Sequence, residues 1–222
     1  MTTLAEIQRH VGVKPDGLWG PNTARAIGKA LDMPGADPFN PAAFFEGMKA
    51  RFPGSLTQAQ VDSINAILRR MAGMPVQHVA YVLATAWHEA RFKPQREWGR
   101  GAGKTYGRKG KYGQAQYGRG LVQLTWDRNY EWADDRLDLN GALLRNFDLA
   151  LEPSVAADIL VIGMLEGAFA SNGKPLASYG PDAKGRFDYV RARQTVNIMD
   201  KADLIAGYAR KFEAALRSGG WK

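Results

Sequence analysis

The sequence predicts a mainly α-helical protein with at most one short β-hairpin. Apolar residues recur at helical spacing along most of the 222 residues, and the best strand candidate is the run LVQLTW at 121–126. No internal repeat is visible. Apolar residues make up 45% of the chain and charged residues 23%, which is ordinary for a folded domain in water.

Residues 1–33 predict two short helices. The first follows a threonine cap at Thr2 or Thr3, and the second opens near Pro21 and runs to Leu31. Two helices bury little surface, so this unit is small. The next segment has the sequence PGADPFNP, with three prolines in eight residues, and predicts a linker at 34–41 ahead of a larger unit at 42–222.

Helix signals continue through the larger unit. Thr57 and Gln60 have the spacing of a capping box, Pro75 and Pro153 each suit the first turn of an apolar helix, and Asp200 is expected to cap the last helix. The apolar residues of that last helix recur every four positions, at Leu204, Tyr208, Phe212 and Leu216.

Positive charge is concentrated in one stretch. The formal net charge is +8, and residues 98–126 contribute +6 of it, with no acidic residue and with eight glycines. The six basic residues are Arg100, Lys104, Arg108, Lys109, Lys111 and Arg119. Interspersed tyrosines and tryptophans would suit nucleic acid or an anionic cell-wall polymer, and a solvated basic loop is the simpler interpretation.

Several classes of protein are excluded or disfavoured. The chain has no cysteine, so thiol nucleophiles, disulfides and thiolate metal sites are excluded, and three separated histidines do not predict a metal site. No run approaches the roughly 18 to 20 apolar residues of a membrane span. The first residues lack a signal-peptide pattern, so we expect synthesis in the cytoplasm.

The first unit resembles a known wall-binding module. Its sequence IQRHVGVKPDGLWGPNTARAI is similar to peptidoglycan-binding type-1 modules, and the match covers Leu4 to Leu31. The resemblance implies that the turn residues contact the cell wall, namely Asp16, Gly17, Trp19 and Gly20.

A carboxylate follows the most apolar helical run. Glu89 comes after about ten mostly apolar residues, and burial of an unpartnered carboxylate is costly. Two interpretations stay open: Glu89 forms an ion pair with a base such as Arg91, or it lines a cleft with a raised pKa. Pro94 disfavours a continuous helix to Glu97, so Glu97 is expected on a turn that faces Glu89. Two facing carboxylates suit glycosidic-bond cleavage.

The larger unit resembles a family of glycan hydrolases. The runs AWHEARFKPQREWGRG and YGRGLVQLTWDRNY are similar to family 19 glycoside hydrolases of the lysozyme-like superfamily, particularly phage endolysins, and the similarity extends from about Thr57 to Leu216. The resemblance implies that Glu89 is the general acid and Glu97 the general base, and that Thr125 holds the attacking water. It implies sugar-binding or groove-shaping roles for Tyr117, Arg119, Gln123, Trp126, Asn129, Tyr130 and Asn197.

Structural roles compete with these assignments. Gln123, Thr125 and Asn129 could simply satisfy backbone groups in a turn, and Trp126 and Tyr130 could belong to the core. His88 is expected to be a packed neighbour rather than a base. The aspartates Asp134, Asp135 and Asp138 are expected to lie on a solvated helix face rather than bind a metal.

The sequence therefore predicts a monomeric, bacteriolytic peptidoglycan hydrolase, with a wall-binding module at 1–33 and a lysozyme-like domain at 42–222, that needs neither metal nor cofactor. By analogy with the family we expect inversion of the anomeric configuration. The expected partners are peptidoglycan and, through loop 98–126, other anionic envelope polymers, and not nucleic acid. Access to the wall would follow holin-type release. A chitinase, a non-catalytic wall-binding protein and a cationic membrane-disrupting protein remain alternatives.

Overall fold

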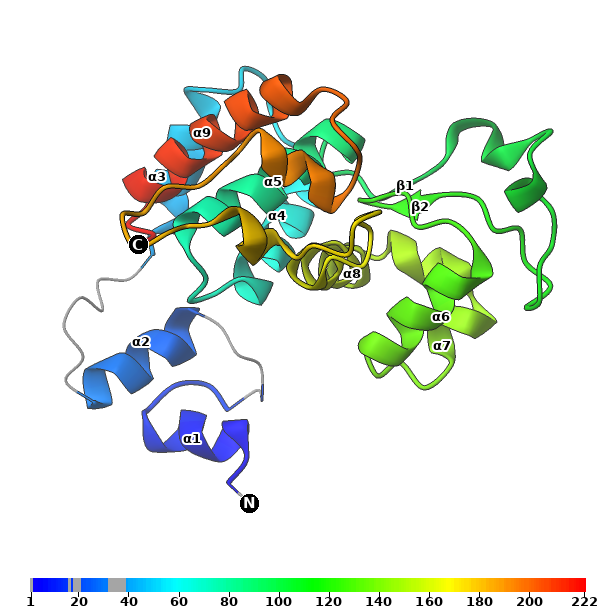
Figure 1. Cartoon of the computed structure of the whole chain (residues 1–222). Helices are drawn as coiled ribbons and strands as arrows, with labels where there is room; N and C mark the ends of the chain where they lie inside the picture. Colours follow the sequence, from blue (N-terminus) through cyan, green and yellow to red (C-terminus); the bar gives the residue numbers. More distant parts are fainter. Residues whose placement is uncertain (1, 16, 18–20, 32–38) are drawn as a thin grey trace.

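The computed structural model describes residues 2–15, 17, 21–31 and 39–222 (Figure 1). This part of the chain contains nine α-helices, five short 3₁₀ helices and one sheet of two strands, so the predicted mainly α-helical class is confirmed. The α-helices are α1 (Leu4–His10), α2 (Pro21–Ala30), α3 (Pro41–Lys49), α4 (Gln58–Arg70), α5 (Val76–Ala90), α6 (Asp127–Arg136), α7 (Ala142–Arg145), α8 (Pro153–Glu166) and α9 (Ala202–Ser218).

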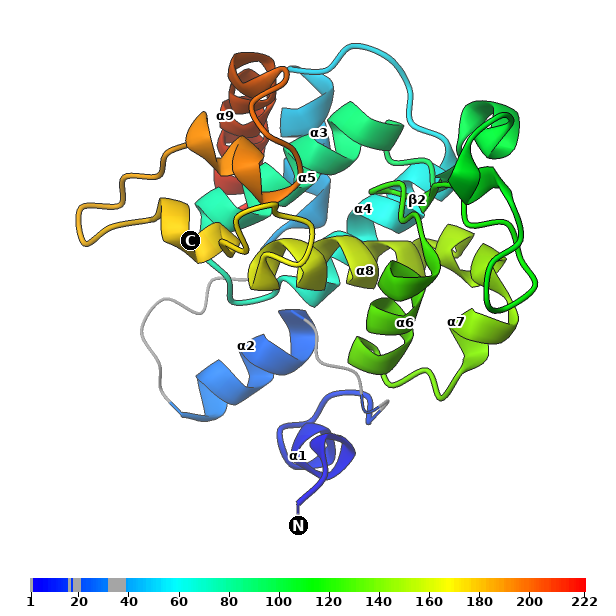
Figure 2. The same cartoon turned by 45° about the vertical axis from the view of Figure 1, so that its right-hand side comes forward.

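Helix α5 forms the centre of the larger core. Twelve of its fifteen residues are buried, because its sequence is apolar nearly all round. Figures 1 and 2 show α5 between α9 on one side and α4 and α8 on the other, and α3 packs against α9. None of the described helices combines the length and apolar character that a bilayer span requires.

A second, smaller core forms around α6, α7 and the 3₁₀ helix η3 (Phe147–Leu151). Its buried side chains are Leu124, Tyr130, Ala133, Leu143, Phe147, Ala150 and Ile159. Two segments contribute to both cores: in 121–124, Leu121 packs in the larger core and Leu124 in the smaller one, and in α8, Leu160 packs in the larger core and Ile159 in the smaller one. Backbone between two rigid cores is held in place from both sides.

Local signals at most helix starts are confirmed. The Thr3 hydroxyl accepts a hydrogen bond from the backbone N–H of Glu6, and the Gln60 amide oxygen accepts one from the backbone N–H of Thr57. Pro153 is the first residue of α8. The cap predicted at Asp200 is wrong, because Lys201 in the left-handed conformation precedes α9 and provides no side-chain cap.

The strand predicted at 121–126 is wrong. The sheet instead pairs β1 (Gln95–Arg96) with β2 (Arg119–Gly120) in antiparallel register. Gln123 has φ 56° and Trp126 has φ 75°, and neither angle is compatible with an extended strand. The 121–126 segment is therefore a turn, and Leu124 contributes only one isolated bridge, to Arg119.

The larger unit begins within the predicted linker. Pro41 is the first residue of α3, and the Asn40 side chain caps that helix. The backbone N–H of Asn40 donates to the carbonyl of Gly219 at 2.7 Å, and the rings of Phe39 and Trp221 lie 5.0 Å apart. The start of this unit is thereby fixed to the carboxyl end of the chain. Residues 34–38 of the expected linker lie outside the described part.

Candidate functional site

Glu89 lies in the last turn of α5 and is held by an arginine distant in sequence. Its side chain is 24% exposed, and its Oε1 accepts a hydrogen bond of 2.8 Å from Nη1 of Arg193. Arg193 is only 2% exposed, and its Nε donates to the carbonyl of Asp200 at 2.9 Å. Oε2 of Glu89 receives no hydrogen bond from the described residues.

The basic partner of Glu89 is therefore Arg193, and Arg91 has another role. Arg91 ends α5 in the left-handed conformation, its guanidinium lies 4.5 Å from the centre of the Trp87 ring, and its carbonyl accepts a hydrogen bond from Gln60. The helix thus ends four residues before Pro94. As predicted, Glu97 lies beyond α5 rather than on it.

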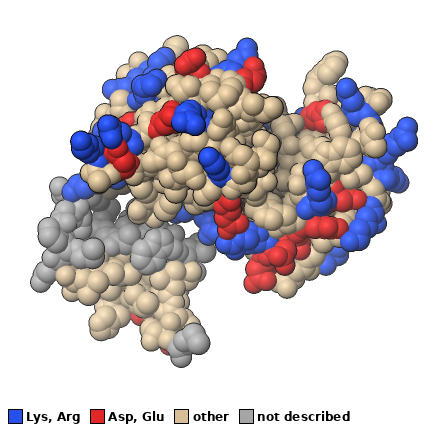
Figure 3. All heavy atoms as spheres, viewed as in Figure 1, with Lys and Arg blue, Asp and Glu red and all other residues tan. Residues whose placement is uncertain are grey.

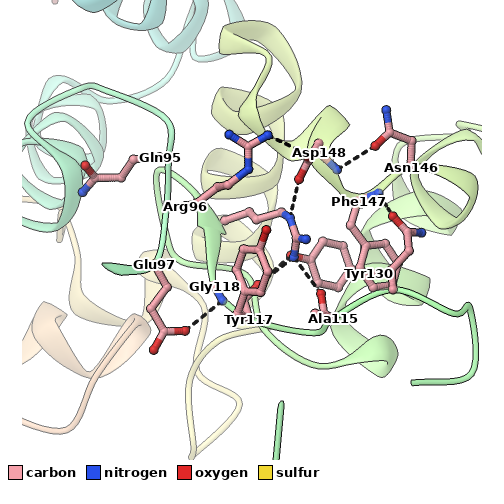
Figure 4. Close-up of polar contacts among 12 residues, drawn as sticks. Gln95, Arg96, Glu97, Ala115, Tyr117, Gly118, Tyr130, Asn146, Phe147 and Asp148 are labelled. Carbon is pink, nitrogen blue, oxygen red and sulfur yellow. Dashed lines mark hydrogen bonds and ion pairs between the residues drawn. The ribbon is translucent and has the colours of Figure 1, made fainter. Parts of the chain in front are cut away.

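Glu97 follows β1 and is fixed by three contacts. Its backbone N–H donates to the carbonyl of Gly118 at 2.7 Å, and the N–H of Gly118 donates to Oε2 of Glu97 at 3.2 Å (Figure 4). The Tyr106 hydroxyl donates to Oε1 at 2.8 Å. The Trp126 ring packs edge-on against Tyr106, with ring centres 5.6 Å apart. The half-buried carboxylate is consequently held at one orientation beside the turn.

The polar side chains of residues 123–129, which cover the end of the turn and the start of α6, satisfy backbone groups. The amide of Gln123 donates to the carbonyls of Gln95 and Gly120, the Thr125 hydroxyl donates to the carbonyl of Gln123 at 2.8 Å, and Asn129 donates to the carbonyl of Thr125 at 2.6 Å. This is the structural role that competes with substrate binding. The Gln123 contacts fasten the turn to β1, two residues from Glu97.

Three predicted groove residues lie inside the protein. Arg119 is 5% exposed, Tyr117 is 7% exposed and Tyr130 is fully buried. Nη1 of Arg119 donates to the carbonyls of Ala115 and Tyr117, each at 2.9 Å, and to the Tyr130 hydroxyl at 3.1 Å. Its guanidinium lies 3.7 Å from the centre of the Tyr117 ring. Instead of contacting a ligand directly, Arg119, Tyr117 and Tyr130 form a buried cluster, here called the hub, that supports the wall of the candidate site.

Asp148 completes this hub from η3. Its Oδ1 accepts from Nε of Arg119 at 2.7 Å, and its Oδ2 accepts from Arg96 at 2.6 Å (Figure 4). Burial alone would raise the pKa of Asp148, but hydrogen bonds and charge from the two arginines outweigh it and lower that pKa. The Tyr130 ring stacks on Phe147 at 3.8 Å, and burial raises the pKa of Tyr130 to about 12.

The remaining catalytic-domain predictions have mixed positions. Asn197 is exposed and its side chain accepts a hydrogen bond from the N–H of Ile198, four residues beyond Arg193. His88 is half-buried, and burial lowers its pKa. Asp134 is buried and accepts hydrogen bonds from two backbone N–H groups of the loop before and within α7, so it is not part of a solvated face. No described group of three or more acidic or histidine side chains is arranged to hold a metal ion.

The amino-terminal unit is organised by a glutamine. Gln8 is 1% exposed; its amide donates to the Thr23 hydroxyl at 2.9 Å, and its carbonyl oxygen accepts from the N–H of Gly17 at 2.8 Å. Gly17 has φ 70°, which fits the predicted turn. The other predicted wall-binding residues, Asp16, Trp19 and Gly20, lie outside the described residues.

The basic stretch at 98–126 is partly neutralised. Lys111 pairs with Glu131 at 2.9 Å, and Arg119 is the buried partner of Asp148. The other four basic residues are exposed and form no ion pair with any described residue: Arg100, Lys104, Arg108 and Lys109. The surface charge of this loop is therefore +4 rather than +6, since Lys111 and Arg119 are compensated.

Sequence reasoning missed three residues that organise the site, Arg193, Asp148 and Tyr106. Each contacts a predicted site residue that is 9 to 104 positions away in the chain, and no short motif marks these pairs. Comparison of the chain with protein-family models, curated proteins and solved structures found no match.

Proposed function

We propose that the protein is a glycoside hydrolase that cleaves the glycan strand of peptidoglycan, with Glu89 and Glu97 as its two catalytic carboxylates. The observation that carries this proposal is that both carboxylates are fixed by donors, Glu89 by a buried arginine and Glu97 by Tyr106 and Gly118. Seven residues, 90–96, separate them in the chain and include the end of α5 and strand β1. If Glu89 served only in a structural ion pair at the end of α5, the protein would not need a second carboxylate held in place at Glu97.

The proposed chemistry is acid–base displacement. Glu89 acts as the general acid and protonates the leaving oxygen, and Glu97 acts as the general base on a water. Arg193 occupies Oε1 of Glu89, so the transferred proton resides on Oε2. Direct displacement inverts the anomeric carbon and requires carboxyl groups roughly 6.5 to 9.5 Å apart.

Thr125 is proposed to help hold the attacking water. The Thr125 hydroxyl donates its proton to the carbonyl of Gln123, so the lone pairs of the hydroxyl oxygen remain available to accept a hydrogen bond from the water. Gln123 and Asn129 each use their amide N–H groups within the turn, so their carbonyl oxygens remain to accept from sugar hydroxyls or amides. Asn197 lies on the segment that carries Arg193, and it is proposed to contact the glycan strand from that segment.

Peptidoglycan is favoured over chitin by two features. Residues 4–31 resemble a wall-binding module, and a tethered module raises the effective concentration of the enzyme near its substrate. The exposed cations of the basic loop attract an anionic envelope. Chitin lacks the negative charge that would engage them.

The experiment is digestion of purified peptidoglycan by wild type, Glu89→Gln and Glu97→Gln, with products identified by mass spectrometry and the initial anomer by NMR. The control is Glu152→Gln, because Glu152 is exposed and makes no side-chain cap. We expect reducing-end fragments of inverted configuration from wild type and the control, and a loss of about 10²–10⁴-fold in rate from each catalytic variant.

Other outcomes select other functions. Wild type that releases no glycan fragment but binds the wall indicates a non-catalytic binding protein, and cleavage confined to chitin indicates a chitinase. Anhydro ends would keep Glu89 as the acid but replace hydrolysis with lytic transglycosylation. Lysis that survives Glu89→Gln and weakens with salt would point to membrane disruption by charge.

A further inference from the structure

We propose that the loop after Glu97 is a selectivity surface that recognises the carboxylates and sugar rings of peptidoglycan and discriminates against uncharged glycan. This surface, here called the cationic platform, consists of Trp98, Arg100, Lys104, Arg108 and Lys109. The proposal rests on the proposed function, because it assigns the substrate class of the same site.

Trp98 is the first observation. Its side chain is 98% exposed, whereas the next most exposed large aromatic among the described residues, Trp126, is 38% exposed. An indole in water gains nothing for folding, and tryptophan is enriched where a protein contacts a partner. Its flat apolar face suits the apolar face of a sugar ring, and its N–H can donate to a hydroxyl.

The backbone around Trp98 holds a defined shape. Gly99 and Gly101 have φ 74° and 70°, and Arg100 between them has φ 49°. A Cβ on Gly107 would lie 2.0 Å from the carbonyl oxygen of Gly101, so the two glycine segments touch. The loop is therefore closed on itself.

The platform is joined directly to a proposed catalytic carboxylate. The N–H of Arg100 donates to the carbonyl of Glu97 at 3.0 Å, and the Tyr106 hydroxyl binds the Glu97 side chain from the same loop. A strand that contacts Glu97 would therefore continue over the ring of Trp98. The cationic platform would therefore contact the sugars that lie beyond the cleaved bond.

Charge is the second observation. The four cations of the platform are exposed, form no ion pair with a described residue, and lie in a stretch without any acidic residue. Figure 3 shows Lys and Arg side chains along the right-hand edge of the molecule, where Figure 1 draws this loop. Uncompensated charges attract anions over roughly 10 Å at 0.1 M salt. Stem peptides and lactyl groups give a peptidoglycan strand repeated carboxylates, which chitin lacks.

The test measures binding in the cleavage-deficient Glu89→Gln background. The probes are peptidoglycan freed of teichoic acid and chitin beads, each at 50 and 200 mM NaCl. One variant neutralises the platform cations by substitution with Gln (Arg100→Gln, Lys104→Gln, Arg108→Gln, Lys109→Gln), and a second is Trp98→Ala. The matched control removes four exposed cations elsewhere, by Lys49→Gln, Arg69→Gln, Lys174→Gln and Lys184→Gln.

We expect the neutralised platform to raise the Kd for peptidoglycan about tenfold at 50 mM NaCl, to lose most of its salt dependence and to leave chitin binding unchanged. Trp98→Ala should weaken binding to both polymers, because the ring contact does not depend on charge. The control should match the parent protein.

The proposal is overturned if the control loses as much peptidoglycan affinity as the platform variant, since net charge would then suffice. Equal losses of affinity for chitin and peptidoglycan in the charge-neutralised variant, or no loss on either polymer in that variant, overturn it as well. The proposal is also overturned if the Glu89→Gln protein binds anionic phospholipid vesicles more tightly than peptidoglycan and added peptidoglycan does not displace it from them. Failure of the proposed function appears separately, as wild type that binds peptidoglycan but does not cleave it.

Discussion

Replacement of Arg119 by methionine tests whether the buried hub holds the site wall in place. Arg119 is 5% exposed and makes four hydrogen bonds, to Asp148, two backbone carbonyls and the Tyr130 hydroxyl. Methionine keeps most of the apolar length of the side chain and removes all four hydrogen bonds, which come from Nε and Nη1. The change therefore reports on the guanidinium rather than on lost volume.

The magnitude follows from what each partner retains. The carbonyl of Tyr117 still accepts from Tyr130 at 3.1 Å, whereas the carbonyl of Ala115 loses its side-chain donor, at a cost of about 1–3 kcal/mol. Asp148 is 38% exposed and keeps Arg96, so loss of that ion pair costs only about 1 kcal/mol. The stacking of Arg119 on the Tyr117 ring contributes roughly 0.5–2 kcal/mol.

These contributions predict a loss of about 2.5–6 kcal/mol in the free energy of unfolding, and a fall in Tm of about 5–24 °C for a chain of this size. The assay is thermal and urea unfolding followed by far-UV circular dichroism. The matched control is Arg96→Met, which removes the exposed partner of the same aspartate and should cost less than about 1 kcal/mol. If both variants lose the same stability, the wall does not depend on the buried guanidinium.

Two further predictions concern the same wall and loop. The folded protein keeps Tyr130 neutral up to a pKa of about 12, whereas an unfolded tyrosine ionises near 10, so wild type should lose stability more steeply than Tyr130→Phe as pH rises from 10 to 12. Urea unfolding between pH 9 and 11 measures this difference, and parallel curves for the two proteins would contradict it. A Cβ on Gly107 meets the Gly101 carbonyl at 2.0 Å, so Gly107→Ala should open the loop to proteolysis and reduce glycan cleavage. Gly207→Ala in α9, where nothing lies within 4 Å, should be neutral or gain up to about 1 kcal/mol, and equal proteolysis of both variants would refute the loop argument.

Helical structure could be predicted because its signals are local. A capping box needs two residues three positions apart, as Thr57 and Gln60 are, and a proline at a helix start acts within one turn. The same reasoning failed at 121–126, where alternating side chains resemble a strand. Positive φ at Gln123 and Trp126 turns that segment, which places Leu121 in one core and Leu124 in the other.

Side-chain exposure divided the predicted site residues. The pattern YGRG–QLTW–NY marked one continuous segment, but it could not distinguish the buried Arg119 and Tyr130 from the half-exposed Thr125 and Asn129. Exposure depends on what packs above a residue, and here Phe147 stacks on Tyr130 from 17 positions away in the chain.

The sequence by itself determined the helical class, most helix starts, the two candidate carboxylates and the position of the basic stretch. Only the tertiary structure decided that Arg193 holds Glu89 across 104 positions and that Asp148 neutralises Arg119 across 29. The physical reason is the range of the forces that specify each feature. Caps and periodicity act over three or four residues, whereas an ion pair forms wherever packing of the whole core brings two charges within hydrogen-bond distance.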